Sequence, residues 1–190
     1  VAPTGIQGHR TFSDEVIAEI VRTTGCHPLY MHMVACAAAH LTKRRRVSPA
    51  TVSQAVSQLL RGKILTGHGP DAKQLVESPL QSVALMPKKT DELRGKILLY
   101  RIARYTSLEQ PVAPWSLLWQ DEMMERYGSE ATWQRICDRL VDANLIVARQ
   151  RRRYGFRFPI LAESLRIKGE HRFRRYCNEI EELVAEEAGR

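Results

Sequence analysis

The sequence predicts a mainly α-helical protein, in which a small helical bundle precedes a second helical domain that carries a short β-hairpin. Three observations predict this fold class. Apolar residues recur at helical spacing in three segments near the amino terminus and in further segments after residue 90. Glycine and proline interrupt the chain between the two sets, and an alternating pattern of apolar residues follows the later set.

Residues 1–61 are expected to form a lid-like bundle of three short helices. The first helix is predicted over residues 11–24, where an apolar stripe recurs at helical spacing. Thr11 and Asp14 have the spacing of a capping box, in which each side chain satisfies a backbone N–H at the helix start. Gly25 follows the stripe and is expected to end the helix.

Prolines mark the starts of the next two helices. Pro28 suits the first turn of a helix over residues 28–42, because an N–H has no intrahelical partner at that position. Ser48 and Pro49 are an N-cap followed by a proline at the first helical position. A third helix is therefore expected to start here and to end near Leu60.

Residues 62–90 are predicted to connect the two domains. They contain several glycines and prolines and show no sustained helical or strand period, as is typical of interdomain segments. The second domain is predicted to begin with a helix near Asp91, which has apolar residues on one face.

Two more helices are predicted in the second domain. Pro114 opens one, which stops near Gly128. Ser129 caps the next, whose apolar face includes Trp133, and Asn144 is expected to break it.

The spacing of apolar residues then changes from helical to alternating. Residues 145–150 are predicted as one strand, and Tyr154, Phe156 and Phe158 alternate with Gly155 and Arg157 in the next. The arginines at 151–153 fall at the tip of this hairpin. Helices followed by a basic β-hairpin are in the order of a winged helix-turn-helix domain.

The winged-helix domain is assigned to residues 91–168. A final amphipathic helix is expected over residues 169–190, with Phe173, Tyr176 and Ile180 among its apolar residues. Its acidic residues are expected to form a solvated face.

Composition excludes some classes of protein. The chain has 29 Lys and Arg against 21 Asp and Glu, a formal net charge of +8, which permits an anionic partner such as nucleic acid without demanding one. The four cysteines lie far apart and form no CxxC pair, which indicates a reducing compartment and, by default, the cytoplasm. No apolar run approaches the roughly 20 residues of a membrane span, so no membrane partner is expected.

A family resemblance rests on three short segments. Thr24 to Leu29, Thr-Gly-Cys-His-Pro-Leu, lies between two predicted helices and looks like the Gly-x-Pro turn in the lid of AAA+-related signal-transduction (STAND-like) ATPases. Those lids continue into a third helix that is entered much as Val47-Ser48-Pro49 enters it here, and a winged helix follows. The segment from Phe156 to Leu161 resembles the end of that domain's last strand.

The resemblance implies a regulatory role within a larger ATPase. Gly25 and Pro28 would lie against the nucleotide when the lid closes, and ATP or ADP would be bound by an upstream P-loop domain. The chain itself has no P-loop, because Gly62-Lys63 and Gly95-Lys96 are each followed by isoleucine instead of Ser or Thr. We therefore expect a non-catalytic segment without a cofactor, which couples nucleotide state to a winged helix that binds a protein partner or DNA. Oligomerisation is left open.

The alternative is a stand-alone winged-helix DNA-binding transcription regulator with an amino-terminal helical dimerisation module. In helix-turn-helix proteins one helix enters the major groove and basic side chains bind phosphates. Three acidic residues on the candidate recognition helix, Glu130, Asp138 and Asp142, would repel phosphate. The candidate nucleic-acid contacts, on this helix and at the hairpin tip, are Gln134, Arg135, Arg139, Arg151, Arg152 and Arg153.

No metal site or catalytic residue is expected. His32, Cys36 and His40 share one helix face, but three successive turns spread them over about 12 Å, too far for one ion. No HExxH or GxSxG signature occurs.

Overall fold

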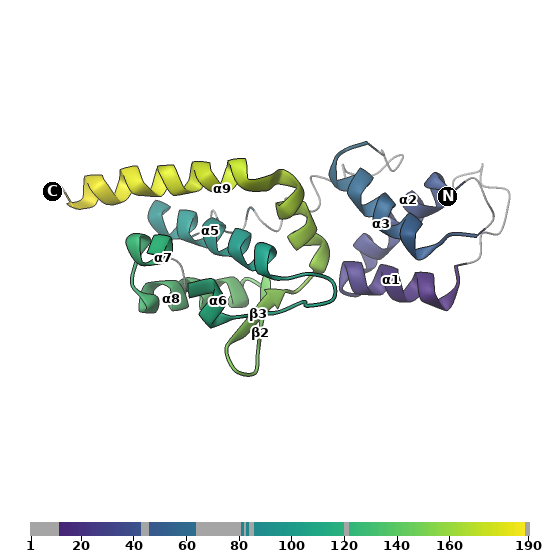
Figure 1. Cartoon of the computed structure of the whole chain (residues 1–190), viewed down its shortest axis with the longest axis horizontal. Helices are drawn as coiled ribbons and strands as arrows, with labels where there is room; N and C mark the ends of the chain where they lie inside the picture. The colour runs from purple at the N-terminus through teal and green to yellow at the C-terminus, as the bar shows by residue number, and fades with distance from the viewer. Residues whose placement is uncertain are drawn as a thin grey trace. The chain divides into compact units, whose positions relative to one another are not determined.

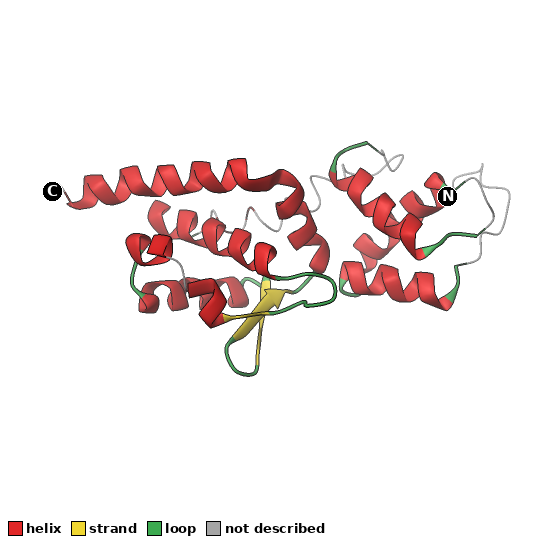
Figure 2. Ribbon diagram, viewed as in Figure 1, coloured by secondary structure: helices red, strands yellow, loops and turns green. Residues whose placement is uncertain are grey.

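The computed structural model is mainly helical and contains a small three-stranded antiparallel sheet, which confirms the predicted class at that level (Figures 1 and 2). The chain divides into two compact units, residues 1–75 and residues 76–190. The division falls within the segment that we expected to connect two domains. The structure describes residues 12–42, 46–63, 81, 83, 86–119 and 122–188.

The first unit contains the three predicted helices. Helix α1 covers Asp14–Thr24, α2 covers Pro28–Leu41 and α3 covers Pro49–Leu60. Apolar side chains from all three helices form the core, with small residues on α2 that allow close packing. The buried side chains include Val16, Ile20, Tyr30, Met33, Val34, Ala37, Ala38, Val52, Ala55, Val56, Leu59 and Leu60.

The ends of these helices match the sequence prediction at most positions. Ser48 is the N-cap of α3, and its hydroxyl accepts a hydrogen bond from the backbone N–H of Thr51 at 3.2 Å. The predicted capping box at α1 is wrong, because the N-cap is Ser13 and Asp14 is the first helical residue. Thr11 lies outside the described residues.

The second unit is built around helix α5, Lys89–Tyr105, which carries buried residues on most of its faces. Helix α8, Glu130–Asp142, is capped by Ser129, whose hydroxyl accepts from the N–H of Thr132. Asn144 follows α8 in the left-handed region (φ 57°), and the N–H of the next residue, Leu145, donates to the carbonyl of Leu140. This hydrogen bond closes the helix end, so the predicted break at Asn144 is confirmed.

The single helix expected from Pro114 to Gly128 is wrong in two respects. Pro114 belongs to strand β1, Ala113–Pro114, and the helical residues after it divide into α6, Trp115–Trp119, and α7, Glu122–Tyr127. Proline is tolerated in this strand because β1 lies at the edge of the sheet, where one side of the backbone needs no ladder partner.

The sheet has the strand order β1-β3-β2, with both pairs antiparallel. Strand β2 covers Ile146–Arg149 and β3 covers Arg153–Phe156, so the hairpin was predicted correctly. The inclusion of Phe158 in the second strand is wrong, because Pro159 starts a helix.

Helix α9, Pro159–Ala188, runs beside α5 and is interrupted by a kink at Gly169 (Figure 1). The backbone of Gly169 (φ 71°, ψ −176°) is in a region that is essentially restricted to glycine. The final helix expected from residue 169 therefore corresponds to the part of α9 beyond the kink, whereas the helical segment from Pro159 to the kink was not predicted.

Candidate functional site

The turn between α1 and α2 is a surface feature of the first unit. Gly25 (φ 66°) and Cys26 (φ 62°) are both left-handed, and the N–H of Gly25 donates to the carbonyl of Val21 at 2.8 Å. His27 is the N-cap of α2 and packs on the ring of Tyr30, with a centroid separation of 4.3 Å. Two residues, Cys26 and His27, separate Gly25 from Pro28, whereas the Gly-x-Pro pattern has one residue between the glycine and the proline.

The two predicted nucleotide-contact residues therefore lie close together in one turn. Gly25 is half-buried and Pro28 is exposed, so both are accessible from the surface of this unit. Their positions are also those that backbone geometry alone would select, a left-handed glycine after one helix and a proline at the start of the next.

The arginines of α8 point toward α5. Nη2 of Arg135 lies 3.2 Å from Oδ1 of Asp91, and Nη1 of Arg139 lies 3.1 Å from Oδ2. Asp91 is only 2% exposed, and Arg94 also donates to its Oδ1 at 3.2 Å. Removing the partners of a buried carboxylate is costly because an uncompensated charge remains. The fold itself therefore uses these two candidate nucleic-acid contacts.

Gln134, the third candidate on α8, is also engaged. Its Nε2 donates to Asp138 at 3.2 Å and to the hydroxyl of Tyr154 at 3.0 Å, and its Oε1 accepts from Nη2 of Arg152 at 2.6 Å. Arg152 is thus drawn toward α8, although it lies at the hairpin tip.

The guanidinium group of Arg152 also contacts α6 and the start of α8. It lies over the ring of Trp115, 5.4 Å from the centroid, and donates to Glu130 at 3.1 Å. The indole N–H of Trp115 donates to the same carboxylate oxygen of Glu130 at 2.8 Å, and its backbone N–H donates to the carbonyl of Arg152. These contacts fix the hairpin against the helices, so Arg152 has a structural role.

The remaining arginines of the hairpin face solvent. Arg149 and Arg153 are directly opposite each other on β2 and β3, and Arg151 lies in the loop between them. All three are exposed, and their side chains have no hydrogen-bond or ion-pair partner in the part of the chain that the structure describes. Opposed like charges destabilise a strand pair, so an anionic ligand would relieve a cost that the fold carries.

The solvent face of α8 has the opposite character. Asp138 and Asp142 are exposed on it, whereas Arg135 and Arg139 are paired with Asp91. With these two arginines paired, the charge left on this face is negative.

The cysteines and histidines make no composite site. Sγ of Cys36 lies 3.6 Å from Nε2 of His32 on α2, and partial burial raises the pKa of the Cys36 thiol. Among the residues that the structure describes, no three His, Cys, Asp or Glu side chains are arranged to hold a metal ion. Cys137 is buried in the second unit, and burial raises its pKa to about 12, so its thiol stays protonated.

The structure thus separates the six predicted nucleic-acid contacts into two groups. Gln134, Arg135, Arg139 and Arg152 are held by protein groups, and only Arg151 and Arg153 face solvent without a side-chain partner among the described residues. Arg149 was missed, although the alternating pattern of the hairpin places it opposite Arg153 and was already visible in the sequence.

Searches of known protein families, of curated proteins and of solved structures found no match to this chain. Across the described ranges, no helix has both the length and the apolar composition that crossing a membrane requires.

Proposed function

We propose that the chain is a non-catalytic regulatory segment of a larger P-loop ATPase, in which a helical lid is followed by a winged helix that contacts a protein partner. The second unit supports the winged-helix assignment by the order of its elements, α5-β1-α6-α7-α8-β2-β3, and by its β1-β3-β2 sheet. The first unit supports the lid assignment by its three helices and by the accessible turn at Gly25 and Pro28.

The observation that favours a protein partner is the pairing of Arg135 and Arg139 with the buried Asp91. A recognition helix that enters a DNA groove needs cations or amides free to reach phosphates and base edges. On α8 those side chains are engaged, and the exposed Asp138 and Asp142 would repel phosphate. The α8 face is therefore better suited to a protein surface than to the major groove.

A second candidate function is DNA binding through the hairpin, and a separate observation favours it. Arg149, Arg151 and Arg153 form a basic tip whose side chains have no partner among the described residues. Such a tip suits phosphate contacts, which bind without reading sequence. On this alternative the chain is a transcription regulator whose hairpin carries the affinity.

A DNA-binding measurement separates the two functions. The chain is titrated with a fluorescent mixed-sequence duplex at about 50 mM and 200 mM salt, the range over which phosphate contacts lose affinity steeply. The test variant is Arg149→Gln/Arg151→Gln/Arg153→Gln. The control variant, Arg172→Gln/Arg174→Gln/Arg175→Gln, removes the same charge from α9.

Absence of binding at the lower salt supports the protein-partner function. Salt-sensitive binding that is lost only in the hairpin variant supports the DNA function, with the salt slope falling by about 2.7 for three lost phosphate contacts. Equal loss in both variants means that net charge alone attracts the duplex. Hydrolysis of ATP by the purified chain would refute the non-catalytic assignment, because the chain has no P-loop to supply it.

A further inference from the structure

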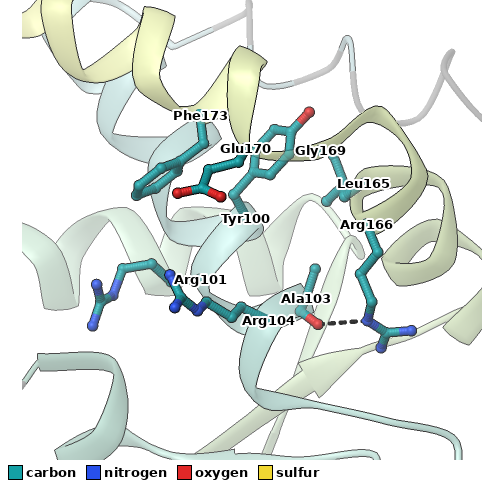
Figure 3. A pocket seen from close by; sticks show the side chains of 9 residues that line it. All are labelled: Tyr100, Arg101, Ala103, Arg104, Leu165, Arg166, Gly169, Glu170 and Phe173. Carbon is teal, nitrogen blue, oxygen red and sulfur yellow. Dashed lines mark hydrogen bonds between the residues drawn. The ribbon is translucent and has the colours of Figure 1, made fainter.

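A pocket of about 370 Å³ opens in the second unit at the bend of α9. Its walls come from α5 and from both sides of the kink at Gly169 (Figure 3). This volume lies within the range of small-molecule sites, roughly 300–1,000 Å³. Neither the turn at Gly25 and Pro28 nor the β2–β3 hairpin contributes residues to this pocket.

The kink of α9 forms part of the pocket wall, because Gly169 lines the pocket together with residues on either side of it. The backbone of Gly169 (φ 71°, ψ −176°) lies outside the helical region and favours glycine. Apart from its immediate neighbours in the chain, a Cβ placed on Gly169 would have no atom within 4 Å, so the space beside the kink is unfilled.

The inner surface of the pocket is largely apolar. Ala103 on α5 and Leu165 on α9 are 1% and 6% exposed and form part of its wall. The rings of Tyr100 and Phe173 lie 6.2 Å apart, measured between centroids, and are inclined by 51°. Such a surface suits a flat apolar group, which gains both area burial and ring contacts.

The polar groups of the pocket are mostly cationic. Arg101 donates to the carbonyls of Leu117 and Leu118, and Arg166 donates to the carbonyl of Ala103 at 2.7 Å, drawn as a dashed line in Figure 3. The one acidic residue of the lining, Glu170, pairs with Arg174 at 3.1 Å.

Arg104 differs from the other two arginines of the pocket. It is exposed, and within the described residues its side chain makes no hydrogen bond or ion pair. A guanidinium in this state is well suited to an incoming carboxylate, sulfonate or phosphate, since its planar N–H groups form charge-assisted hydrogen bonds.

We propose that this pocket binds a small organic anion with an aromatic body. The aromatic part packs against Tyr100 and Phe173, and the anionic group pairs with Arg104. A bound ligand would contact α5 and both parts of α9 together, so it would hold the bend of α9 in one position.

The experiment uses two probes with the same aromatic body. Anilinonaphthalene sulfonate carries the anionic group, and phenylnaphthylamine is its neutral parent. We expect saturable one-to-one binding of the sulfonate, followed by fluorescence, and binding of the neutral parent that is weaker by roughly tenfold or more, as for loss of a hydrogen bond to a charged group. Amide chemical-shift changes should be confined to Tyr100–Arg104 and Leu165–Phe173.

Two variants test the assigned roles. Arg104→Gln should weaken binding of the sulfonate by roughly 10- to 100-fold and leave the neutral probe unchanged. Arg149→Gln removes the same charge from the hairpin and should change neither affinity by more than about twofold, because an exposed charge at a distance is screened by salt. Circular dichroism and the thermal midpoint check that both variants remain folded.

Four results would overturn the proposal. These are absence of sulfonate binding, equal affinity for the two probes, an Arg104→Gln affinity equal to that of the unmodified chain, and shift changes centred outside the pocket. Equal affinity for the two probes would identify a general apolar surface instead of an anion site.

Discussion

The arginine side chains of this protein have different roles, and the surroundings of each side chain decide its role. Arg135 and Arg139 neutralise a buried carboxylate, Arg152 fixes the hairpin to the helices, and Arg149 and Arg153 face solvent opposite each other. Of these three groups, only the last is available to a partner. The chemistry of arginine suits all three roles, because its planar fork of donors can bind carboxylates, carbonyls, aromatic faces and phosphates.

Arg151 illustrates the cost of placing arginine at the hairpin tip. It is left-handed (φ 61°), a conformation that costs roughly 1–2 kcal/mol for a residue other than glycine. Arg151→Gly removes this strain and adds about 0.5–1 kcal/mol of chain entropy to the unfolded state. We expect the free energy of unfolding to rise by about 0.5–1 kcal/mol in urea titrations.

The same variant tests whether the strain serves binding. If the hairpin contacts an anionic partner, Arg151→Gly should weaken that contact while it stabilises the fold. Arg151→Asn is the matched control, because asparagine tolerates the left-handed region and also removes the charge. A stability decrease in both variants would contradict this account.

Gly155 is required for a different reason, which is space. A Cβ at this position would lie 2.0 Å from the carbonyl oxygen of Pro111 and 3.0 Å from Cγ1 of Val112. Because the first contact is with backbone, Gly155→Ala must displace β3 from the segment that leads into β1. We expect destabilisation by about 1–3 kcal/mol or more, measured by thermal or urea unfolding.

Gly128→Ala is the control for this substitution. The three atoms nearest to its Cβ would belong to the side chains of Arg94 and Thr132, at 3.3–3.4 Å, so a shift of a few tenths of an ångström would relieve the contact. Gly128→Ala should therefore lower the free energy of unfolding by less than about 1 kcal/mol. Equal destabilisation by the two substitutions would show that the contact with Pro111 is not the cause.

At the scale of elements, local signals predicted helix ends better than they predicted short elements. Ser48-Pro49 and Ser129 placed the starts of α3 and α8, because a cap and its first turn lie within a few residues. Strand β1 was missed because it has two residues, one of them proline, and forms only by pairing with β3.

The candidate site shows the same limit. The residue types of α8 were visible in the sequence, but the partner of Arg135 is Asp91, 44 positions earlier in the chain. Spacing along one helix carries no information on such a contact, because tertiary packing decides it. The exposure of the hairpin arginines follows from the local strand–turn–strand pattern alone. For that reason the sequence was sufficient to indicate Arg151 and Arg153.

Helix α9 is fastened to α7 by a polar contact that should make its stability depend on pH. The hydroxyl of Tyr127 donates to Oε1 of Glu181 at 2.7 Å, and Arg126 donates to the same oxygen at 3.2 Å. These hydrogen bonds lower the pKa of Glu181, and burial followed by the bond to Glu181 raises the pKa of Tyr127.

The two pKa shifts define the pH range over which this contact stabilises the folded protein. The folded pKa of Glu181 is below its usual 4.5, so its stabilising contribution is complete above that pH and is lost as the pH falls through the folded value. The folded pKa of Tyr127 is above its usual 10.0, so its contribution is complete below that pH and is lost as the pH rises through the folded value. The hydrogen bond between Tyr127 and Glu181 contributes to both pKa shifts, after burial in the case of Tyr127.

Tyr127→Phe should therefore lower the thermal midpoint most at neutral pH. The difference in thermal midpoint between this variant and the unmodified chain should narrow as the pH falls below about 4.5 or rises above about 10. Beyond these values Glu181 or Tyr127 changes its charge in the unfolded chain before it does so in the folded chain. Thermal midpoints measured across this pH range test it. Glu181→Gln serves as the control and should remove the acid limb of the difference. Parallel curves at every pH would mean that the contact makes no titratable contribution.

At the scale of the whole molecule, each of the two units has a hydrophobic core of its own. The first unit buries residues from α1, α2 and α3, and the second buries residues from α5 to α9. Compact units with separate cores are expected to unfold by separate cooperative transitions. The three tryptophans of the chain, Trp115, Trp119 and Trp133, all belong to the second unit, so their fluorescence reports on that unit alone.

Leu59→Ala tests whether the two units unfold separately, because the tryptophans report only on the second unit. Leu59 is 1% exposed in the core of the first unit, so truncation should destabilise that unit by about 2–5 kcal/mol. Far-ultraviolet circular dichroism, which detects helices of both units, should then show an earlier transition in urea, whereas tryptophan fluorescence should keep its midpoint. Leu140→Ala, in the core of the second unit, should shift the fluorescence midpoint instead. If Leu59→Ala moves both signals together, the two units unfold as one cooperative body.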